Sequence, residues 1–324
     1  MALNNEAWLR VAWLGQYATA EKLATSARVT FESHGDTRGL AQSLTILAGV
    51  HFAHDDANEA VSLASEAVAL LDRAQDYWLE AQALRELALI QIMSGLTAEA
   101  AGSAQRGLEL CSEVGLPDLA PGLHALLAWT LLEEGHLDRA MQVSPKAVAT
   151  LGRGVEFSHL VHYVHSLTLR SADRIPEADE HLLQAGRLVD AALSDVPAGD
   201  RGGSDESVRL LSMILTAAKS REPRYWTGPW PRADAPLGRG LREGDYTTVT
   251  LTTWQPSDEA ARSERAARQA AAKRIIEEAS SQGSVPGVVD IAEVLGVSVA
   301  TVRRDLKALR DSGVPIRTRG SDRT

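Results

Sequence analysis

VVDIAEVLGVSVATVRRDLKALRDSG, from Val288 to Gly313, is the stretch that decides the fold of the C-terminal part of this chain. It predicts a short helix, a tight turn and a longer helix. Gly296 can take a positive φ at little steric cost and so closes the turn, and Ser298 is placed to cap the second helix. Ile291, Ala292 and Leu295 give the first helix an apolar side, so the two helices can pack on a shared core.

The second helix has two contrasting faces. Val302, Leu306 and Leu309 recur at helical spacing and share its apolar face. The opposite face and its flanks carry small and basic residues: Ala300, Thr301, Arg303, Arg304 and Lys307. A helix that enters the major groove of DNA needs this combination of an apolar back and a basic front.

These residues resemble the recognition helix of DeoR-type winged-helix repressors, which reads roughly S-x-x-T-[IV]-R-R-D-L. The matching residues are Ser298, Thr301, Val302, Arg303, Arg304, Asp305 and Leu306. The resemblance extends from Lys273 to Gly320, and the segment 316–320 is similar to the wing of that family. It implies binding to double-stranded DNA through Ser298, Ala300, Thr301, Arg303, Arg304, Lys307, Arg317 and Arg319. The alternative is a helical hairpin with a solvated basic face.

DeoR-type repressors carry this domain at the N-terminus, before a sugar-phosphate sensor. Here the similar segment is C-terminal and no such sensor is recognisable, so the resemblance implies no sugar ligand.

Charge is distributed unevenly along the chain. The net charge is −10 over 324 residues, which taken alone argues against a nucleic-acid binder. Residues 296–324, however, hold 7 Lys and Arg against 3 Asp and Glu, a net of +4. The sequence therefore predicts an acidic body with a basic end, where phosphate contacts would be made.

Several protein classes find no support in the sequence. The single cysteine, Cys111, cannot form an intrachain disulfide and suits a reducing cytoplasm, and no apolar run is long enough to span a membrane. The G-x-x-x-x-G-K-[ST], G-x-S-x-G, H-E-x-x-H and CxxC motifs are absent. We therefore expect a cytoplasmic protein that is not an enzyme, with no cofactor and no metal.

Residues 1–195 repeat a helical hairpin pattern. Five short turns, beginning with GQYATA at Gly15, end in Ala20, Ala60, Ala100, Ala140 and Ala178, at spacings of 40, 40, 40 and 38. Seven residues after each comes another small residue: Ala27, Ala67, Gly107, Ala147 or Ala185. Small residues there let neighbouring helices approach closely. Such hairpins must stack on one another to bury their apolar faces.

The pattern G-x-[YL]-x-x-A resembles the tetratricopeptide repeat (TPR), and the 40-residue period is similar to the repeat domains of maltose-activator-type transcription regulators. This resemblance implies a mainly α fold, a right-handed α-solenoid of TPR-like hairpins followed by the small C-terminal winged helix-turn-helix domain. The alternative is an ordinary helical bundle with a chance period. The scaffold implies little about the ligand, because it hosts many.

The segment between these two parts predicts a capping helix and a linker. Ser207–Ser220 reads as an amphipathic helix after the Gly-rich break at 196–207, and the stretch up to residue 244 is rich in Pro, Gly and Trp. The alternation of Thr and apolar residues around Val249 predicts one strand, which would pair with a wing strand, the linker or the same strand of a second subunit. We expect a helix from Pro256 to about Ser280, whose first half could extend as a lever or a dimer helix.

Two further groups of residues invite a functional interpretation. His159, His162 and His165 fall within one stripe of a helix, but no carboxylate or cysteine stands at matching spacing, so half-buried packing is favoured over a metal site. Four tryptophans lie in or near the first helices of the repeats: Trp8, Trp13, Trp78 and Trp129. They could stack on a peptide or small molecule, although packing within the repeats is favoured.

The sequence thus predicts three parts: repeats at 1–195, a capping helix and linker at 196–244, and a strand, helix and winged helix-turn-helix at 245–324. The function it favours is a sequence-specific DNA-binding transcriptional regulator. We expect it to act as a homodimer whose repeat array binds a peptide, protein or small ligand. The alternative is an adaptor in which both the array and the C-terminal domain bind proteins.

Overall fold

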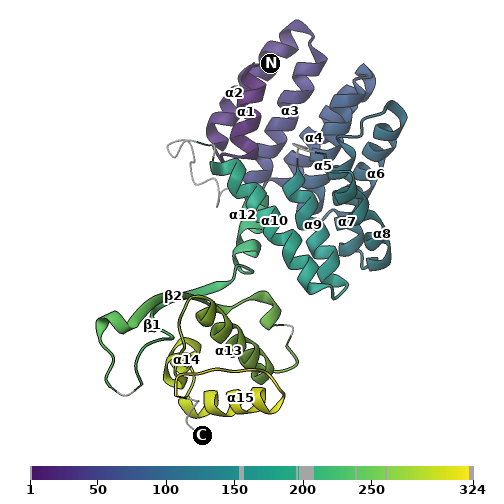
Figure 1. Ribbon diagram of the computed structural model, residues 1–324. Helices are drawn as coiled ribbons and strands as arrows, with labels where there is room; N and C mark the ends of the chain where they lie inside the picture. Colours follow the sequence, from purple (N-terminus) through teal and green to yellow (C-terminus); the bar gives the residue numbers. More distant parts are fainter. Residues whose placement is uncertain are drawn as a thin grey trace. The chain divides into compact units, whose positions relative to one another are not determined.

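The computed structural model describes residues 2–152, 157–194, 196, 208–237, 239–259 and 261–320. Its contacts divide the chain into two compact units, Met1–Ser220 and Arg221–Thr324. Within these described residues, the first unit is a helical array and the second combines a two-stranded sheet with three helices (Figure 1). No helix within the described ranges is long and apolar enough to cross a membrane.

Five helical hairpins build the described part of the array, as the repeat pattern predicts. Their helices are α1 (Ala2–Ala12), α2 (Tyr17–His34), α3 (Thr37–Ala53), α4 (Ala57–Ala74), α5 (Tyr77–Met93), α6 (Thr97–Val114), α7 (Ala120–Glu133), α8 (Leu137–Ala149), α9 (Ser158–Ser171) and α10 (Ile175–Ser194). Each hairpin packs on the next, so the unit is a solenoid of TPR-like repeats (Figure 1).

The turn inside every hairpin has the same backbone conformation. The first residue of each aligned turn lies in the left-handed region: Gly15 (φ 62°), Asp55 (60°), Gly95 (80°), Gly135 (76°) and Asp173 (59°). Only glycine adopts this region without steric cost, and aspartate is among the side chains that tolerate it best. This requirement explains why the repeat begins with Gly or Asp.

Small residues at the repeat positions lie where helices meet. All five turn alanines are fully buried. At Gly107, one of these positions, an added Cβ would lie 2.7 Å from Leu123 Cδ2, and at Gly186, next to the repeat position Ala185, it would lie 2.6 Å from Ala218 Cβ. A larger side chain at such a site would therefore force neighbouring helices apart.

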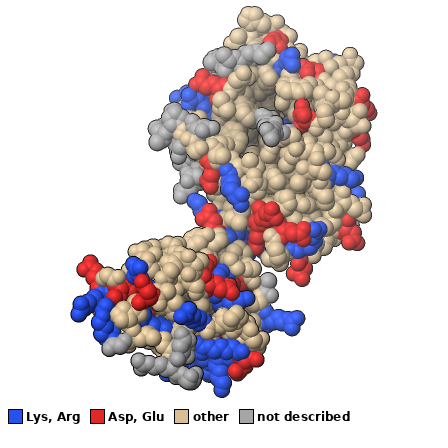
Figure 2. All heavy atoms as spheres, in the orientation of Figure 1, with Lys and Arg blue, Asp and Glu red and all other residues tan. Residues whose placement is uncertain are grey.

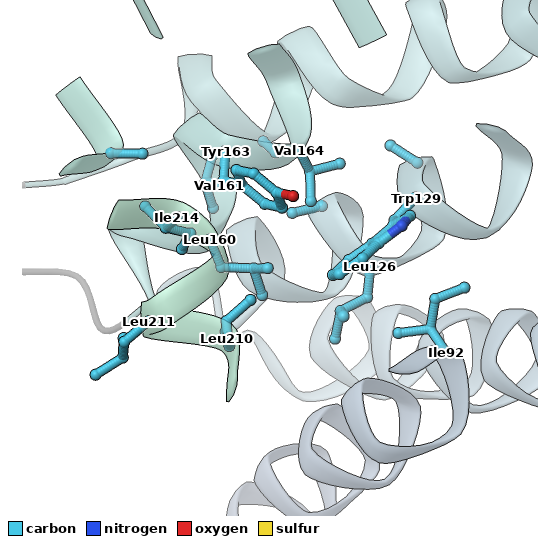
Figure 3. Close-up of a cluster of buried hydrophobic side chains, with 14 of the residues drawn as sticks. Ile92, Leu126, Trp129, Leu160, Val161, Tyr163, Val164, Leu210, Leu211 and Ile214 are labelled. Carbon is cyan, nitrogen blue, oxygen red and sulfur yellow. The ribbon is translucent and has the colours of Figure 1, made fainter. Parts of the chain in front are cut away.

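A continuous apolar core runs through the C-terminal half of the array. Ile92, Leu126 and Trp129 pack in the same cluster as Leu160 and other residues of α9 (Figure 3). Helix α12 (Arg209–Lys219) joins this cluster through Leu210, Leu211, Ile214, Leu215 and Ala218, and it packs against α10. It covers the apolar face that the last hairpin leaves open, as expected for the capping helix. The predicted break at 196–207 lies, apart from Val196, outside the described residues.

The second unit begins with a strand that the sequence did not predict. Strand β1 (Arg224–Pro231) pairs antiparallel with β2 (Tyr246–Trp254), and the short 3-10 turns η1 (Glu243–Asp245) and η2 (Pro256–Asp258) flank β2. Helices α13 (Glu264–Ser281), α14 (Val288–Leu295) and α15 (Val299–Asp311) follow. Trp230 of β1 is 3% exposed and packs in the same core as Val249 and Leu251 of β2.

The segment expected to be a linker is therefore partly a structural element. Of the three partners considered for the strand around Val249, the structure selects the preceding Pro- and Trp-rich segment. Its tryptophans supply apolar area to a small core, and this explains why a proline-rich sequence is ordered. The contacts place the unit boundary after Ser220, whereas the sequence suggested a third part from residue 245.

Two further local predictions differ from the structure. The helix expected from Pro256 begins only at Glu264, where the Ser263 side chain accepts from the Ala266 N–H at 3.2 Å. Pro256 instead opens η2, in which Asp258 accepts two hydrogen bonds from the Arg274 guanidinium at 2.8 Å each. Residues 316–320, expected to resemble a wing, contain no strand.

Candidate functional site

The turn between α14 and α15 has the geometry that the sequence predicts. Gly296 has φ 65° and ends α14, and the Val297 N–H donates to the Ala292 carbonyl at 3.0 Å. Ser298 has an extended backbone, and its Oγ accepts from the Thr301 N–H at 3.1 Å. The cap satisfies one of the free N–H groups at the start of α15 and fixes where the helix begins.

The back of α15 is buried in the core of the second unit. Val302 and Leu306 are each 1% exposed and belong to the same cluster as Ile275 of α13 and Ile291 of α14. Leu309 is half-buried against that cluster. Because three helices share this core, α15 cannot rotate about its axis without exposing apolar surface.

The opposite face of α15 is exposed and basic. Exposed side chains on it are Ser298, Ala300, Arg303, Arg304 and Lys307, and Thr301 is half-buried. The Thr301 Oγ1 lies 2.9 Å from the Ser298 Oγ and accepts a long hydrogen bond from Arg304 Nη2 at 3.5 Å. Within the described parts of the chain, Arg303, Arg304 and Lys307 form no ion pair. On the face seen in Figure 2, Lys and Arg side chains gather over the C-terminal unit.

Asp305 is a residue whose role the sequence analysis missed. Its side chain is 3% exposed and accepts from Arg268 Nε at 2.6 Å, and Arg265 Nε lies 3.6 Å from its other oxygen. Gln269 Nε2 also reaches Asp305, at 3.4 Å. The hydrogen bond to Asp305 raises the pKa of Arg268. The acidic residue of the R-R-D-L motif thus ties α15 to the first half of α13, which is not a free lever.

The two arginines expected on the wing occupy different environments. Arg317 is exposed. Arg319, by contrast, is half-buried and donates from its guanidinium to the carbonyls of Ala235 (3.1 Å) and Pro236 (2.5 Å), while its N–H donates to the Pro286 carbonyl at 2.8 Å. Arg319 therefore fastens the C-terminal segment to the loop after β1. This geometry does not fit the expectation that Arg319 contacts DNA.

The array contains two adjoining cavities, which lie along the first helices of its hairpins, mainly α1, α3 and α5. One, of about 160 Å³, is lined by aromatic and aliphatic residues that include Trp8, Trp13 and Phe52. The other, of about 380 Å³, is lined by Trp8, Trp78 and several polar side chains. Trp129, in contrast, is 6% exposed and belongs to the core. Three of the four tryptophans singled out in the sequence thus line cavities, and the fourth packs within the repeats.

The histidine stripe gains a fourth member from α10. His162 and His181 stack, with their Nδ1 atoms 2.9 Å apart, and His165 meets His181 edge-on with ring centroids 4.6 Å apart. Burial, with a smaller contribution from His181, lowers the pKa of both His162 and His165 to about 4. His159 is 6% exposed and its pKa is also lowered to about 4, mainly by burial. In the described regions no three metal-binding side chains are arranged to hold a metal ion.

Comparison with known proteins identifies the C-terminal fold. Residues 272–323 match the DeoR-like helix-turn-helix domain. The match includes α14, α15 and most of α13, so the chain carries a helix-turn-helix of the DeoR-like kind. No curated protein matches the chain in sequence.

The array resembles solved helical-repeat structures. A Rap protein complexed with competence and sporulation factor is 16% identical, with a TM-score of 0.50 over 67% of this chain and 62% of that one. Aspartyl phosphate phosphatase F from Bacillus subtilis is 14% identical, with a TM-score of 0.51 over 67% and 58%. TPR-like repeats of a Podosopora anserina kinesin light chain are 17% identical, with a TM-score of 0.45 over 60% and 96%. This chain thus spans less than two thirds of the first two proteins, and at these identities the likeness concerns the fold.

Proposed function

We propose that this protein is a sequence-specific DNA-binding transcriptional regulator. The observation that carries the proposal is the exposed basic face of α15, whose apolar back is fixed in a three-helix core. The DeoR-like match of the same segment supports it. In this proposal α15 enters the major groove, and Arg304, Arg303 and Lys307 reach bases or phosphates.

The N-terminal end of α15 supplies the remaining contacts. Ser298 and Thr301 present hydroxyl groups at the start of the helix, where backbone N–H groups and the helix dipole favour a phosphate. Ala300 is exposed and small, so it lets the helix approach the floor of the groove. Arg317 would contact the neighbouring DNA backbone. Arg319 is left out because its guanidinium already binds two carbonyls.

The test is selection of binding sites from a random duplex library by the full chain, followed by titration of the selected duplex. Arg304→Ala should relax the preference at one base pair by about 1–3 kcal/mol, the contribution of a bidentate arginine–guanine pair. Lys273→Ala is the control, because Lys273 is an exposed cation on α13 outside the proposed groove-facing surface. A library without enrichment, and binding without steep salt dependence, would instead favour the adaptor function.

The array is proposed to receive the input signal by binding a peptide. Its two cavities share Trp8, and the larger one adds amide side chains such as Asn5 and Gln82, which can bond a peptide backbone. The Rap protein of similar fold was solved with a bound factor, which supports a ligand at such an array. Peptides selected from a displayed random library should lose affinity for Trp8→Ala and keep it for Tyr77→Ala. Tyr77 is exposed and outside both cavities. Equal affinity for both variants would refute this assignment.

A further inference from the structure

A basic pocket lies between the first turns of α13 and the recognition helix α15. Its volume is about 270 Å³. Residues of both helices line it: Arg265, Arg268, Thr301, Arg304, Asp305, Lys307, Ala308 and Asp311. Thr301, Arg304 and Lys307 belong to the proposed DNA-reading face, whereas Arg265 and Arg268 come from a helix that the sequence analysis did not connect with DNA.

The two α13 arginines differ in how firmly they are held. Arg268 is 26% exposed and bonds the buried Asp305 at 2.6 Å, so its charge is largely compensated. Arg265 is 62% exposed, and its Nε lies 3.6 Å from Asp305, a distance too long for a strong hydrogen bond. The two arginines share the single negative charge of Asp305, so one positive charge remains between them, and the long contact leaves the Arg265 guanidinium beside Asp305 and exposed at the pocket.

The charges around the pocket leave a net attraction for an anion. Four cations and two carboxylates line it, a formal net of +2. If the Arg268–Asp305 pair is set aside, the cations Arg265, Arg304 and Lys307 face a single carboxylate, that of Asp311. Cations from two helices converge on one concave site, an arrangement that concentrates positive potential and suits a phosphate group.

We propose that this pocket binds a backbone phosphate of DNA, with Arg265 as a contact outside the recognition helix and Asp305 as the residue that positions it. The proposal rests on the function proposed above and adds a contact from α13. A phosphate held beside Arg304 would fix how α15 is oriented in the groove, because phosphate contacts set register while base contacts set specificity.

The experiment measures the salt dependence of binding to a fluorescein-labelled random-sequence duplex by anisotropy, with the full chain in 50 to 200 mM KCl. Arg265→Gln should flatten the slope of log K against log[KCl] by about 0.9, the value for one phosphate contact. The ratio of wild-type to Arg265→Gln affinity should therefore be about 3.5-fold larger at 50 mM than at 200 mM KCl. Arg265→Lys should keep most of the wild-type slope, since it keeps the charge.

Lys273→Gln is the matched control. It removes the same charge from an exposed position on the same helix, where Lys273 lies 3.8 Å from Glu277. Equal slopes for Arg265→Gln and Lys273→Gln would overturn the phosphate contact while leaving DNA binding by α15 in place. A wild-type chain with no salt-dependent DNA binding would overturn both proposals. If inorganic phosphate binds the wild type and not Arg265→Gln while the DNA slopes stay equal, the pocket is a free-anion site and the proposal is also wrong.

Discussion

Replacing Asp305 by Asn tests whether the acidic residue of the R-R-D-L motif holds the helix-turn-helix together. The substitution keeps the shape of the side chain and removes the charge that Arg268 binds at 2.6 Å. A fully buried ion pair that loses one partner costs about 3–5 kcal/mol, and an exposed pair contributes about 0–1 kcal/mol. Asp305 is 3% exposed but Arg268 is 26% exposed, so the stranded guanidinium can still reach water. We therefore expect a loss of about 2 kcal/mol, the value for a hydrogen bond to a charged group.

Hydrogen exchange of the full chain, followed by mass spectrometry, measures this loss locally. A loss of about 2 kcal/mol corresponds to exchange about 30-fold faster at the protected amides of α13 and α15, since each 1.36 kcal/mol is a factor of ten. Peptides from the array should be unchanged. Asp311→Asn is the control, because Asp311 is an exposed carboxylate on the same helix. If Asp305→Asn exchanges no faster than Asp311→Asn, Asp305 does not couple α13 to α15 as argued.

Two further predictions concern the array. Gly186→Ala should destabilise the array by about 1–3 kcal/mol, because the new Cβ would lie 2.6 Å from Ala218 Cβ. In Gly102→Ala the new Cβ meets nothing within 4 Å, so this variant should stabilise the array by up to about 1 kcal/mol. Thermal unfolding that ranks the two variants the other way would show that helix propensity outweighs packing. Because the pKa of His162 and His165 is lowered to about 4 in the folded state, the unfolded chain binds more protons between about pH 6.5 and 4, so stability should fall as pH drops through that window. The Tm of His162→Gln should fall less between pH 7 and 5 than that of the wild type, and an equal fall would contradict the assignment.

Local periodicity was sufficient to predict most of the fold. The array was predicted from small residues at fixed spacing. The pattern is regular because each of these residues is buried against a neighbouring helix, where a larger side chain does not fit. The cap at Ser298, the turn at Gly296 and the buried Val302 and Leu306 were all predicted, because each depends on residues within one helical turn or two. In such segments local preference and tertiary packing agree.

Interactions between distant residues could not be predicted in the same way. Arg319 lies 83 residues from Pro236 in the chain, and Asp305 lies 37 residues from Arg268. Nothing in the local sequence distinguishes these arginines from the exposed ones on α15. Strand β1 was missed because Pro and Gly argue against a strand. Prolines are nevertheless tolerated at strand positions whose N–H would not donate a hydrogen bond to the paired strand.

The edges of the two-stranded sheet bear on how a second copy could bind. The outer edge of β2 is covered by α13, since the N–H groups of Thr250 and Thr252 donate to the side chains of Gln282 and Glu278. Their carbonyls accept from Gln282 and Arg274. The N–H and C=O groups of Thr250 therefore point away from β1. In an antiparallel pair the backbone groups of every second residue along each strand point outward in this way.

Thr248 and Tyr246 follow this alternation, and their partners on β1 are Pro229 and Pro231. The backbone N and C=O of these two prolines therefore also point away from β2. Prolines there cost no hydrogen bond within the sheet and leave the outer edge of β1 without an N–H at two positions. Both edges thus disfavour strand addition, which argues against the alternative in which the strand around Val249 pairs with the same strand of a second subunit. If the protein acts as a homodimer, as expected from the sequence, the subunits must meet through side-chain surfaces. Tyr225 and Thr227 are the remaining outward positions of β1. Replacing Thr227 by proline, which removes its outward N–H, should then leave the mass measured by sedimentation equilibrium unchanged.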